Sequence, residues 1–411
     1  MTTRILLILI PTLLLSNLFA YCQKRSVDSV QYEGEFYYKV PRSKFDRLSI
    51  GDIKSDYGYS DNESLPNGKW IQFYNEGDYI PGRIFNLQND TLNGNYVEIY
   101  ENRFVAEEGA YSNGKKTGKW KYWYPNGVVK EEGFYTEGEE TGEWESWYSD
   151  GSYKYKGKKG IRVAENGYVF NIYVGAWRWY FANGKIKNEG YYDDLGYETG
   201  KWKKYYENGQ LKLEENYVNG KREGNAIKYY PNGQFESRFL YERGSGYYSK
   251  LKDSIYTVYY NNGQLKEKGP IYNGMRFGIW ESWYENGQKK SKGNFIYKTY
   301  TFCSTVPVDE AYLLKEGEWT YWYPNGKKMA EGEYGFGKTN IETNCEGGAD
   351  ITTFYTTDDW EFWDENGKEV SKKYLLDKNI WEEDRQPMDG LHYMWEHFFE
   401  EDWEDSLPPG M

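Results

Sequence analysis

A 24-residue repeat is the feature that most constrains the fold of this chain. Residues 118–142 read GKWKYWYPNGVVKEEGFYTEGEETG, and the next copy of the pattern opens at Gly142. Gly118 and Gly142 are 24 residues apart, as are Trp120 and Trp144. A fixed period of this size indicates a repeat architecture.

The copies can be followed along the chain by their turns and by their first tryptophan. Asn-Gly or Asp-Gly turns end at Gly127, Gly151, Gly184, Gly209, Gly233, Gly263, Gly287, Gly326 and Gly367. Full leading strands start at Trp120, Trp144, Trp177, Trp202, Trp280 and Trp319. Weaker copies start at Trp70 and Trp360, and we assign Ala226 and Val258 to the tryptophan position in two more. Matching the pattern in this way gives about ten copies.

The residue types of one copy predict a β-hairpin. Trp, Tyr and Phe favour strands because they fit a pleated, half-buried surface. Side chains alternate between the faces of a strand, so we expect Trp120 and Tyr122 on one face and Trp123 on the other. The sequence YPNG at residues 124–127 suits a type I turn whose glycine supplies the left-handed residue of a bulge. Such short turns join antiparallel strands.

We therefore predict an all-β fold for the chain. It should be an elongated, mostly single-layered antiparallel β-meander that grows by one hairpin per copy, with a short capping helix at its C-terminal end. Aromatic residues make up 20% of the sequence but hydrophobic residues only 38%. A thick aliphatic core is not expected from this composition, whereas aromatic side chains stacked along a repeat array account for it.

The repeated phrase G-x-W-x-x-(W/Y)-Y-x-N-G, followed by x-E-G-x-Y and G-x-x-x-G, resembles the MORN-repeat variant found in many bacterial proteins. Some of those proteins carry the label YwqK-type antitoxin. The resemblance covers residues 68 to 370 and implies a long, twisted antiparallel sheet. It implies little about chemistry, because the family is defined by its scaffold.

The N-terminal residues predict export from the cytoplasm. Residues 1–20 combine one early basic residue, Arg4, with an apolar run and Ala20 near the end, which is typical of a secretory signal peptide. Cys22 offers the alternative of a lipid-modified N-terminus, although the bulky Tyr21 precedes it. A polar segment with one degenerate repeat, residues 21–67, is expected between the signal peptide and the array at 68–370.

Two insertions in the array each contain one cysteine. They span residues 296–316 and 335–357, and the cysteines are Cys303 and Cys345. In an exported protein, two cysteines in corresponding loops of neighbouring copies favour a disulfide that joins the insertions. The alternative is two unrelated thiols. Two ligands are too few for a zinc site.

The last segment, residues 371–411, is acidic. Between Trp381 and Asp405 it carries ten acidic side chains and one arginine, a net charge of −9 within the −13 of the whole chain. Apolar residues from Leu391 to Trp403 recur at helical spacing, so we expect a short amphipathic helix that covers the last strand. The alternative is an acidic docking tail for a basic partner.

The sequence does not point to an active site. Both histidines, His392 and His397, lie in the acidic tail five residues apart, so on a helix they would not face one metal ion. Acidic pairs such as Glu131-Glu132, Glu139-Glu140 and Glu214-Glu215 recur throughout the array, and none stands out as a glycosidase pair. The glycine-rich loops lack the Lys-Ser/Thr of a phosphate loop. We expect no cofactor and no metal. The acidic balance argues against nucleic acid and, in the same way, against anionic lipid.

Two aromatic rows are the candidate functional residues. The indole row consists of Trp120, Trp144, Trp177, Trp202, Trp280 and Trp319, and we expect it to be the core of the scaffold. The outer row consists of Trp123, Trp147, Tyr180, Tyr205, Trp283 and Trp322. Its members point to the opposite face and form the candidate binding face.

The main functional hypothesis is a non-enzymatic, exported scaffold that binds a protein or an envelope component along an aromatic sheet face. One alternative is an antitoxin-like protein that neutralises a toxin. The other is a carbohydrate-binding or carbohydrate-processing protein. Contact with a membrane is expected only indirectly or through a lipid on Cys22.

Overall fold

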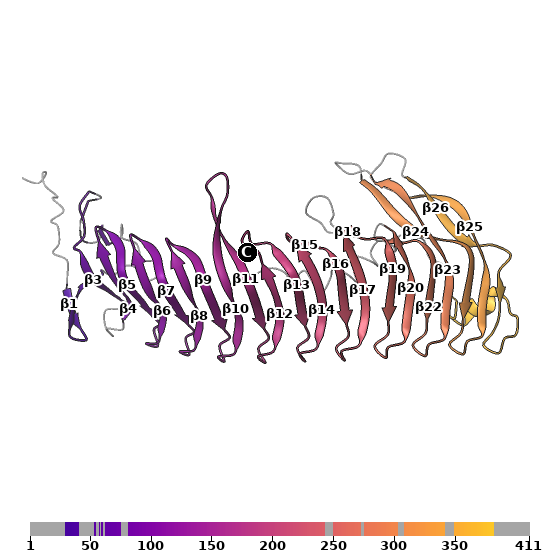
Figure 1. Ribbon diagram of the computed structural model, residues 1–411, viewed down its shortest axis with the longest axis horizontal. Helices are drawn as coiled ribbons and strands as arrows, with labels where there is room; N and C mark the ends of the chain where they lie inside the picture. Colours follow the sequence, from indigo (N-terminus) through magenta and orange to yellow (C-terminus); the bar gives the residue numbers. More distant parts are fainter. Residues whose placement is uncertain are drawn as a thin grey trace, which may run out of the picture. The chain divides into compact units, whose positions relative to one another are not determined.

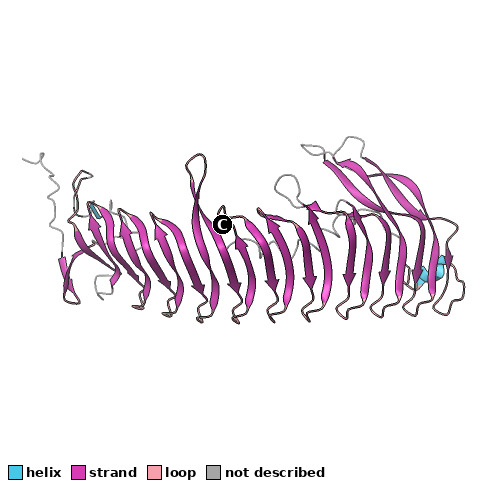
Figure 2. Cartoon of the chain, in the orientation of Figure 1, coloured by secondary structure: helices cyan, strands magenta, loops and turns pink. Residues whose placement is uncertain are grey.

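The computed structural model describes residues 29–40, 53–54, 57, 59–60, 62–74, 81–242, 250–272, 275–302, 308–341 and 349–381. They fall into two compact units, residues 1–151 and 152–411, so the array expected at 68–370 is divided after Gly151. Figure 2 shows strands through almost all of the described residues, as the all-β prediction requires. The helices in this part of the chain are too short to cross a membrane.

The first unit is an antiparallel meander in which one strand pair, near the start of the chain, is parallel. Its strands are β1 Ser29–Tyr32, β2 Glu35–Lys39, β3 Gly68–Phe73, β4 Pro81–Gln88, β5 Thr91–Ile99, β6 Val105–Ser112, β7 Lys115–Trp123, β8 Val129–Thr136 and β9 Glu139–Trp147. From β3 to β9 each strand pairs antiparallel with the next. In contrast, β2 pairs parallel with β3, with Tyr38 opposite Trp70. The β1–β2 hairpin therefore does not continue the meander as a further copy.

The second unit continues the same pattern with longer strands near its end. Its first strands are β10 Tyr153–Val163, β11 Val169–Tyr180, β12 Ile186–Tyr192, β13 Glu198–Tyr205, β14 Leu211–Val218, β15 Lys221–Arg222, β16 Gly224–Tyr229, β17 Phe235–Glu242, β18 Lys250–Leu251 and β19 Ser254–Tyr259. The others are β20 Leu265–Tyr272, β21 Met275–Arg276, β22 Gly278–Trp283, β23 Lys289–Phe302, β24 Val308–Trp322, β25 Lys328–Ile341, β26 Ala349–Thr356, β27 Glu361–Phe362 and the helix α2 Lys372–Asp377.

The hairpin turn has the predicted geometry. In the β7–β8 hairpin the Gly127 amide donates to the Tyr124 carbonyl at 2.9 Å, and the Tyr124 amide donates to the Val128 carbonyl at 2.8 Å. Gly127 has φ +82°, the left-handed conformation that closes such a turn. The pairing register shifts between Tyr122 and Trp123, which marks the bulge.

The same register corrects one assignment made from the sequence. Trp120 pairs with Gly133 and Trp280 with Gly293, whereas the residue opposite Gly269 is Tyr256. Tyr256, not Val258, therefore occupies the first-tryptophan position of its copy. Tyr256 is an aromatic residue buried to 8% exposure, so the copy keeps a ring in its core.

The core of each unit is built from indole rings that lie on glycines. The indole of Trp144 packs directly on Gly133 of β8, where an ideal Cβ atom would lie 2.1 Å from the ring. We call a glycine in this position the seat of the indole. The same arrangement joins Gly109 to Trp120, Gly157 to Trp177, Gly190 to Trp202, Gly269 to Trp280, Gly293 to Trp319 and Gly332 to Trp360. The glycine of the E-G-x-Y phrase is therefore required by the tryptophan of the following copy.

The insertions lengthen hairpins, as expected. Figure 1 shows the β10–β11 hairpin rising above β12 and β13, and its tip exposes Val163, Tyr168 and Phe170. The second pair of insertions forms the upper halves of β23 to β26. There Tyr312 and Leu314 of β24 pack with Ile351 of β26, so a small second layer departs from the single-layered prediction.

The ends of the array are covered by packed side chains. In the first unit Ile53, Tyr57 and Leu65 bury Trp70. In the second, Leu375 of α2 and Trp381 pack with the ring of Trp360, which forms the short C-terminal cap that the sequence predicted. The helix expected between Leu391 and Trp403 lies outside the described residues. The predicted signal peptide, the three cysteines and both histidines also lie outside the described residues.

Candidate binding surface

The indole row lies in the core. Trp120 and Trp144 have no exposed surface, Trp177 is 1% exposed, and Trp280 and Trp319 are each 3% exposed. Trp202 is the one member of the row that is only half-buried. Five of the six rings are therefore inaccessible to a partner.

The outer row is more accessible. All six of its members, from Trp123 to Trp322, are half-buried. Trp123 lies on the same face as Lys121, whose ammonium group is 5.3 Å from the centre of its ring. The rings of the outer row thus offer their free surface on the face opposite the indoles.

A ladder of tyrosine hydroxyls holds the backbone of the outer row. The Tyr124 hydroxyl donates to the carbonyl of Trp147 at 3.0 Å, and the Tyr260 hydroxyl donates to that of Trp283 at 2.9 Å. The same bond joins Tyr100 to Trp123, Tyr206 to Tyr229, Tyr230 to Tyr259, Tyr284 to Trp322 and Tyr323 to Trp363. In these copies the tyrosine therefore fixes the position of the outer aromatic residue in the next.

The turn asparagines form a second ladder. Asn126 accepts from the Val128 amide at 3.1 Å within its own turn and donates to the Ser149 carbonyl of the next turn at 2.8 Å. In the second unit Asn208 reaches Pro231 in the same way, and Asn286 reaches Pro324. The tyrosine and the asparagine of Y-x-N-G are thus contacts between copies. The recurrence of this tyrosine and asparagine at a fixed period is visible in the sequence. From the sequence it predicts the turn, whereas the contacts between copies are seen only in the structure.

Ion pairs accompany the outer row on its face. Lys119 pairs with Glu132 at 2.7 Å, and Lys201 pairs with Glu214 at 2.9 Å. Lys289 pairs with Glu281 at 2.7 Å, and this hydrogen bond lowers the pKa of the Glu281 carboxyl. The candidate face therefore combines aromatic rings with neutralised charges, as the centre and rim of a protein interface do.

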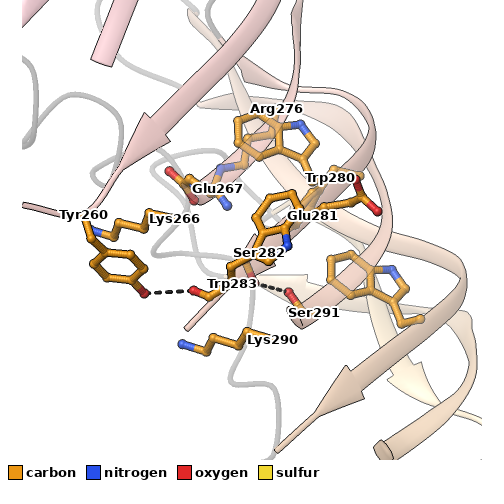
Figure 3. A pocket seen from close by; sticks show the side chains of 12 residues that line it. Tyr260, Lys266, Glu267, Arg276, Trp280, Glu281, Ser282, Trp283, Lys290 and Ser291 are labelled. Carbon is orange, nitrogen blue, oxygen red and sulfur yellow. Dashed lines mark hydrogen bonds and ion pairs between the residues drawn. The ribbon is translucent and has the colours of Figure 1, made fainter. Parts of the chain in front are cut away.

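A notch opens in the opposite, indole face of the second unit. Ser282 stands where other copies have Tyr122 or Tyr321, and the missing ring leaves a cavity of about 280 Å³. Figure 3 shows the Ser282 and Ser291 hydroxyls at its floor, 2.6 Å apart. The Arg276–Glu267 ion pair, at 2.7 Å, also lines the notch. Its lining is part aromatic and part polar, with Trp280 among the rings.

The acidic pairs do not form a two-carboxylate site. Glu214 lies on the outer face with Lys201, whereas Glu215 is buried, pairs with Arg222 at 2.5 Å and accepts from the Tyr217 hydroxyl. Neighbouring residues of a strand point to opposite faces, so two adjacent carboxylates cannot act on one bond. Within the described residues, no three His, Cys, Asp or Glu side chains gather as metal ligands.

Comparison with known proteins identifies the repeat. The model of a family described as MORN repeat variant matches residues 116–137, 173–194, 198–219, 252–273, 278–297 and 315–334. Among curated proteins none matches the chain.

Two similar solved structures are toxin complexes. One is TcdB2–TccC3 without its hypervariable C-terminal region, with 8% identity and a TM-score of 0.16. It covers 78% of this chain, which spans 18% of that one. The other is the Photorhabdus luminescens Tc holotoxin pore with a TccC3 mutation, with 10% identity, a TM-score of 0.15, 78% of this chain and 20% of that one. This chain thus spans about a fifth of the length of those chains, and TM-scores this low support no comparison of function.

Proposed function

Because the chain is built from MORN repeat variants, we propose that it is a non-enzymatic scaffold whose outer row binds another protein or a component of the cell envelope. A repeat fold of this all-β kind is typical of interaction modules. The observation that carries the proposal is the outer row itself. It presents one half-buried aromatic residue per copy on the face opposite the indole row. Aromatic residues are the side chains that most often dominate the energy of a protein interface.

Export is part of the proposal and is supported by the sequence of residues 1–20. A partner is then expected outside the cytoplasm. An antitoxin role is a special case of the same binding function, with an exported toxin as the partner. The notch favours a second candidate, carbohydrate binding, because its hydroxyl groups and ring edges suit a small polyol.

The test is a pull-down from envelope extract with residues 21–411. The binding variant carries Trp123→Ala, Trp147→Ala, Trp283→Ala and Trp322→Ala. A matched control carries Tyr168→Ala and Phe170→Ala, two exposed rings at the tip of the β10–β11 hairpin. Circular dichroism checks the fold of both.

A partner retained by the wild type and the control, and lost by the folded binding variant, supports the outer row. Equal retention by all three proteins would contradict it. Binding of a glycan that is lost on filling the notch with Ser282→Tyr would favour the second candidate instead.

A further inference from the structure

Three rings of the indole row are held between a glycine and a cation. Trp120 lies on Gly109, and the Lys116 ammonium group is 3.8 Å from its ring centre. Arg276 is placed in the same way at 4.4 Å from Trp280, and Lys315 at 5.2 Å from Trp319. In each copy the cation comes four residues before the tryptophan. The chain thus supplies its own cation–π partner at a fixed position.

Trp202 has the glycine but not the cation. Its ring lies on Gly190, where an ideal Cβ atom would be 2.1 Å away. Four residues before it stands Glu198, so the position of the ammonium group is taken by a carboxyl group. Among the cation–ring contacts of the described residues, none involves Trp202. Trp202 is half-buried, whereas Trp120, Trp280 and Trp319 are covered. Trp144 also follows a carboxyl residue, Glu140, by four positions, but its ring has no exposed surface, so the exposure is particular to Trp202.

The rings around Trp202 nevertheless form a box. Trp179 is stacked with it at 6.0 Å, Tyr192 meets it edge-on at 5.0 Å, and Tyr217 is at 6.1 Å. The corresponding neighbours of Trp120, Tyr111 and Tyr135, are at 5.1 and 6.0 Å. The aromatic surroundings that hold the Lys116 ammonium group are therefore conserved in geometry around Trp202.

The polar groups at this box are only partly satisfied. The Glu198 carboxyl accepts a hydrogen bond from its own backbone amide, and burial raises its pKa. Arg222 lowers that pKa by its charge, but its guanidinium group pairs with Glu215. The Nε1 atom of Trp202 is buried and has no hydrogen-bond partner in the described structure, whereas that of Trp120 donates to the Ala110 carbonyl.

We propose that Glu198, Trp202 and Tyr217 form a receptor for an alkylammonium group from outside the chain, namely the side chain of a lysine on a basic partner. The ammonium group would lie over the indole, as the Lys116 ammonium lies over Trp120, with Glu198 as its counter-ion. Of the net charge of −13, −9 lies between Trp381 and Asp405, so the charge that favours a basic partner at this site is the Glu198 carboxyl itself. The receptor lies on the indole face, so it does not depend on binding by the outer row.

The test uses the full chain and a small probe, N-acetyl-lysine methylamide. Its neutral analogue, acetylated on the side-chain nitrogen, is the ligand control. Calorimetry and the NMR signals of the indole N–H groups follow both titrations. We expect saturable binding of the lysine probe only, with a shift of the Trp202 indole signal, and binding about tenfold weaker in Glu198→Gln.

Glu198→Lys is the decisive variant, because it restores the residue type that stands at Lys116. We expect it to stay folded, to hold its own ammonium group over Trp202 and to lose binding of the probe. Glu165→Lys makes the same charge change at the exposed hairpin tip and should bind like the wild type. Equal binding of the two ligands, no binding of either, or full binding by a folded Glu198→Lys would each overturn the proposal. A preference for an arginine probe would replace lysine as the partner.

Discussion

An ideal Cβ atom on Gly133 would lie 2.1 Å from the indole Cδ2 atom of Trp144. The tryptophan of one copy thus occupies the space that a side chain would need in the copy before it. Since the same relationship recurs in both units, glycine and tryptophan specify each other along the array. The pair fixes how closely neighbouring strands pack.

Gly133→Ala should therefore destabilise the protein strongly. The methyl group collides with a ring that has no exposed surface and cannot move aside, and overpacking of this kind costs about 2 to 4 kcal/mol. Thermal unfolding of the whole protein measures the loss. Gly160→Ala is the control, because its Cβ would meet neighbours only at 3.4 Å or more. Equal unfolding temperatures for the two variants would contradict the packing argument.

Removal of one rung of the tyrosine ladder should have a moderate effect. Tyr124→Phe loses the hydrogen bond to the Trp147 carbonyl, and we expect a loss of about 1 kcal/mol in the free energy of unfolding. Phe181 stands at the same position of its own copy without a hydroxyl, so the ring alone is compatible with the fold. Urea unfolding of Tyr124→Phe and of Phe181→Tyr should move stability in opposite directions.

The two aromatic rows should respond differently to truncation. Trp280→Ala removes a ring that is only 3% exposed and is expected to cost about 3 to 5 kcal/mol. Trp283→Ala removes a half-buried ring three residues later and is expected to cost about half as much or less. Denaturant unfolding compares them directly. A larger cost for Trp283 than for Trp280 would mean that the outer row is core as well.

Cys303 and Cys345 are proposed to form a disulfide. The strands that lead to them, β23 and β25, belong to hairpins that pack through Tyr312, Leu314 and Ile351. Mass spectrometry of the unreduced protein should find one peptide pair joined by sulfur, and reduction should lower stability by about 3 kcal/mol. Cys303→Ser should have the same effect as reduction. Free thiols at both positions in protein prepared under oxidising conditions would refute the pairing.

The Glu281–Lys289 pair should contribute to stability only above acidic pH. The hydrogen bond from Lys289 lowers the pKa of Glu281 in the folded protein, so the unfolded chain binds its proton first as the pH falls. The contribution is complete above the ordinary value of 4.5 and is lost as the pH falls through the lowered folded pKa. Glu281→Gln should therefore be less stable than wild type at pH 7 and equal to it near the acid limit. Thermal melts across this range check the difference, which should shrink in high salt.

The sequence allowed the hairpins, their turns and the two aromatic faces to be predicted, because each depends on local residue types. The YPNG turn and the opposite faces of Trp120 and Trp123 are examples. The seats of Trp120 and Trp144 could also have been predicted, since Gly109 and Gly133 precede them by the same interval. In copies with an insertion the interval is longer, so the seat cannot be found by counting. The assignment of Val258 was wrong because the tryptophan position lies four residues before the turn tyrosine, and counting back from Tyr260 gives Tyr256.

Other features could not be predicted because they depend on contacts between distant segments. The parallel pairing of β2 with β3 accompanies the packing of Ile53, Tyr57 and Leu65 on Trp70, and no local pattern encodes it. The packing of β24 on β26 joins two insertions that share no motif. The candidate binding face was defined by residue type, but the partial exposure of Trp202 within the indole row is seen only in the structure.

The parallel strand β2 also bears on how such a chain can change its length during evolution. A meander of this kind grows when a hairpin pairs antiparallel with its terminal strand. The edge of β3 is already occupied by β2, which pairs parallel with it, so a hairpin cannot be added there. At the other end Trp381 and Leu375 cover Trp360. Duplication or loss of a copy is therefore tolerated best in the interior, where most hairpins carry the same glycine seat and the same tyrosine and asparagine contacts for their neighbours.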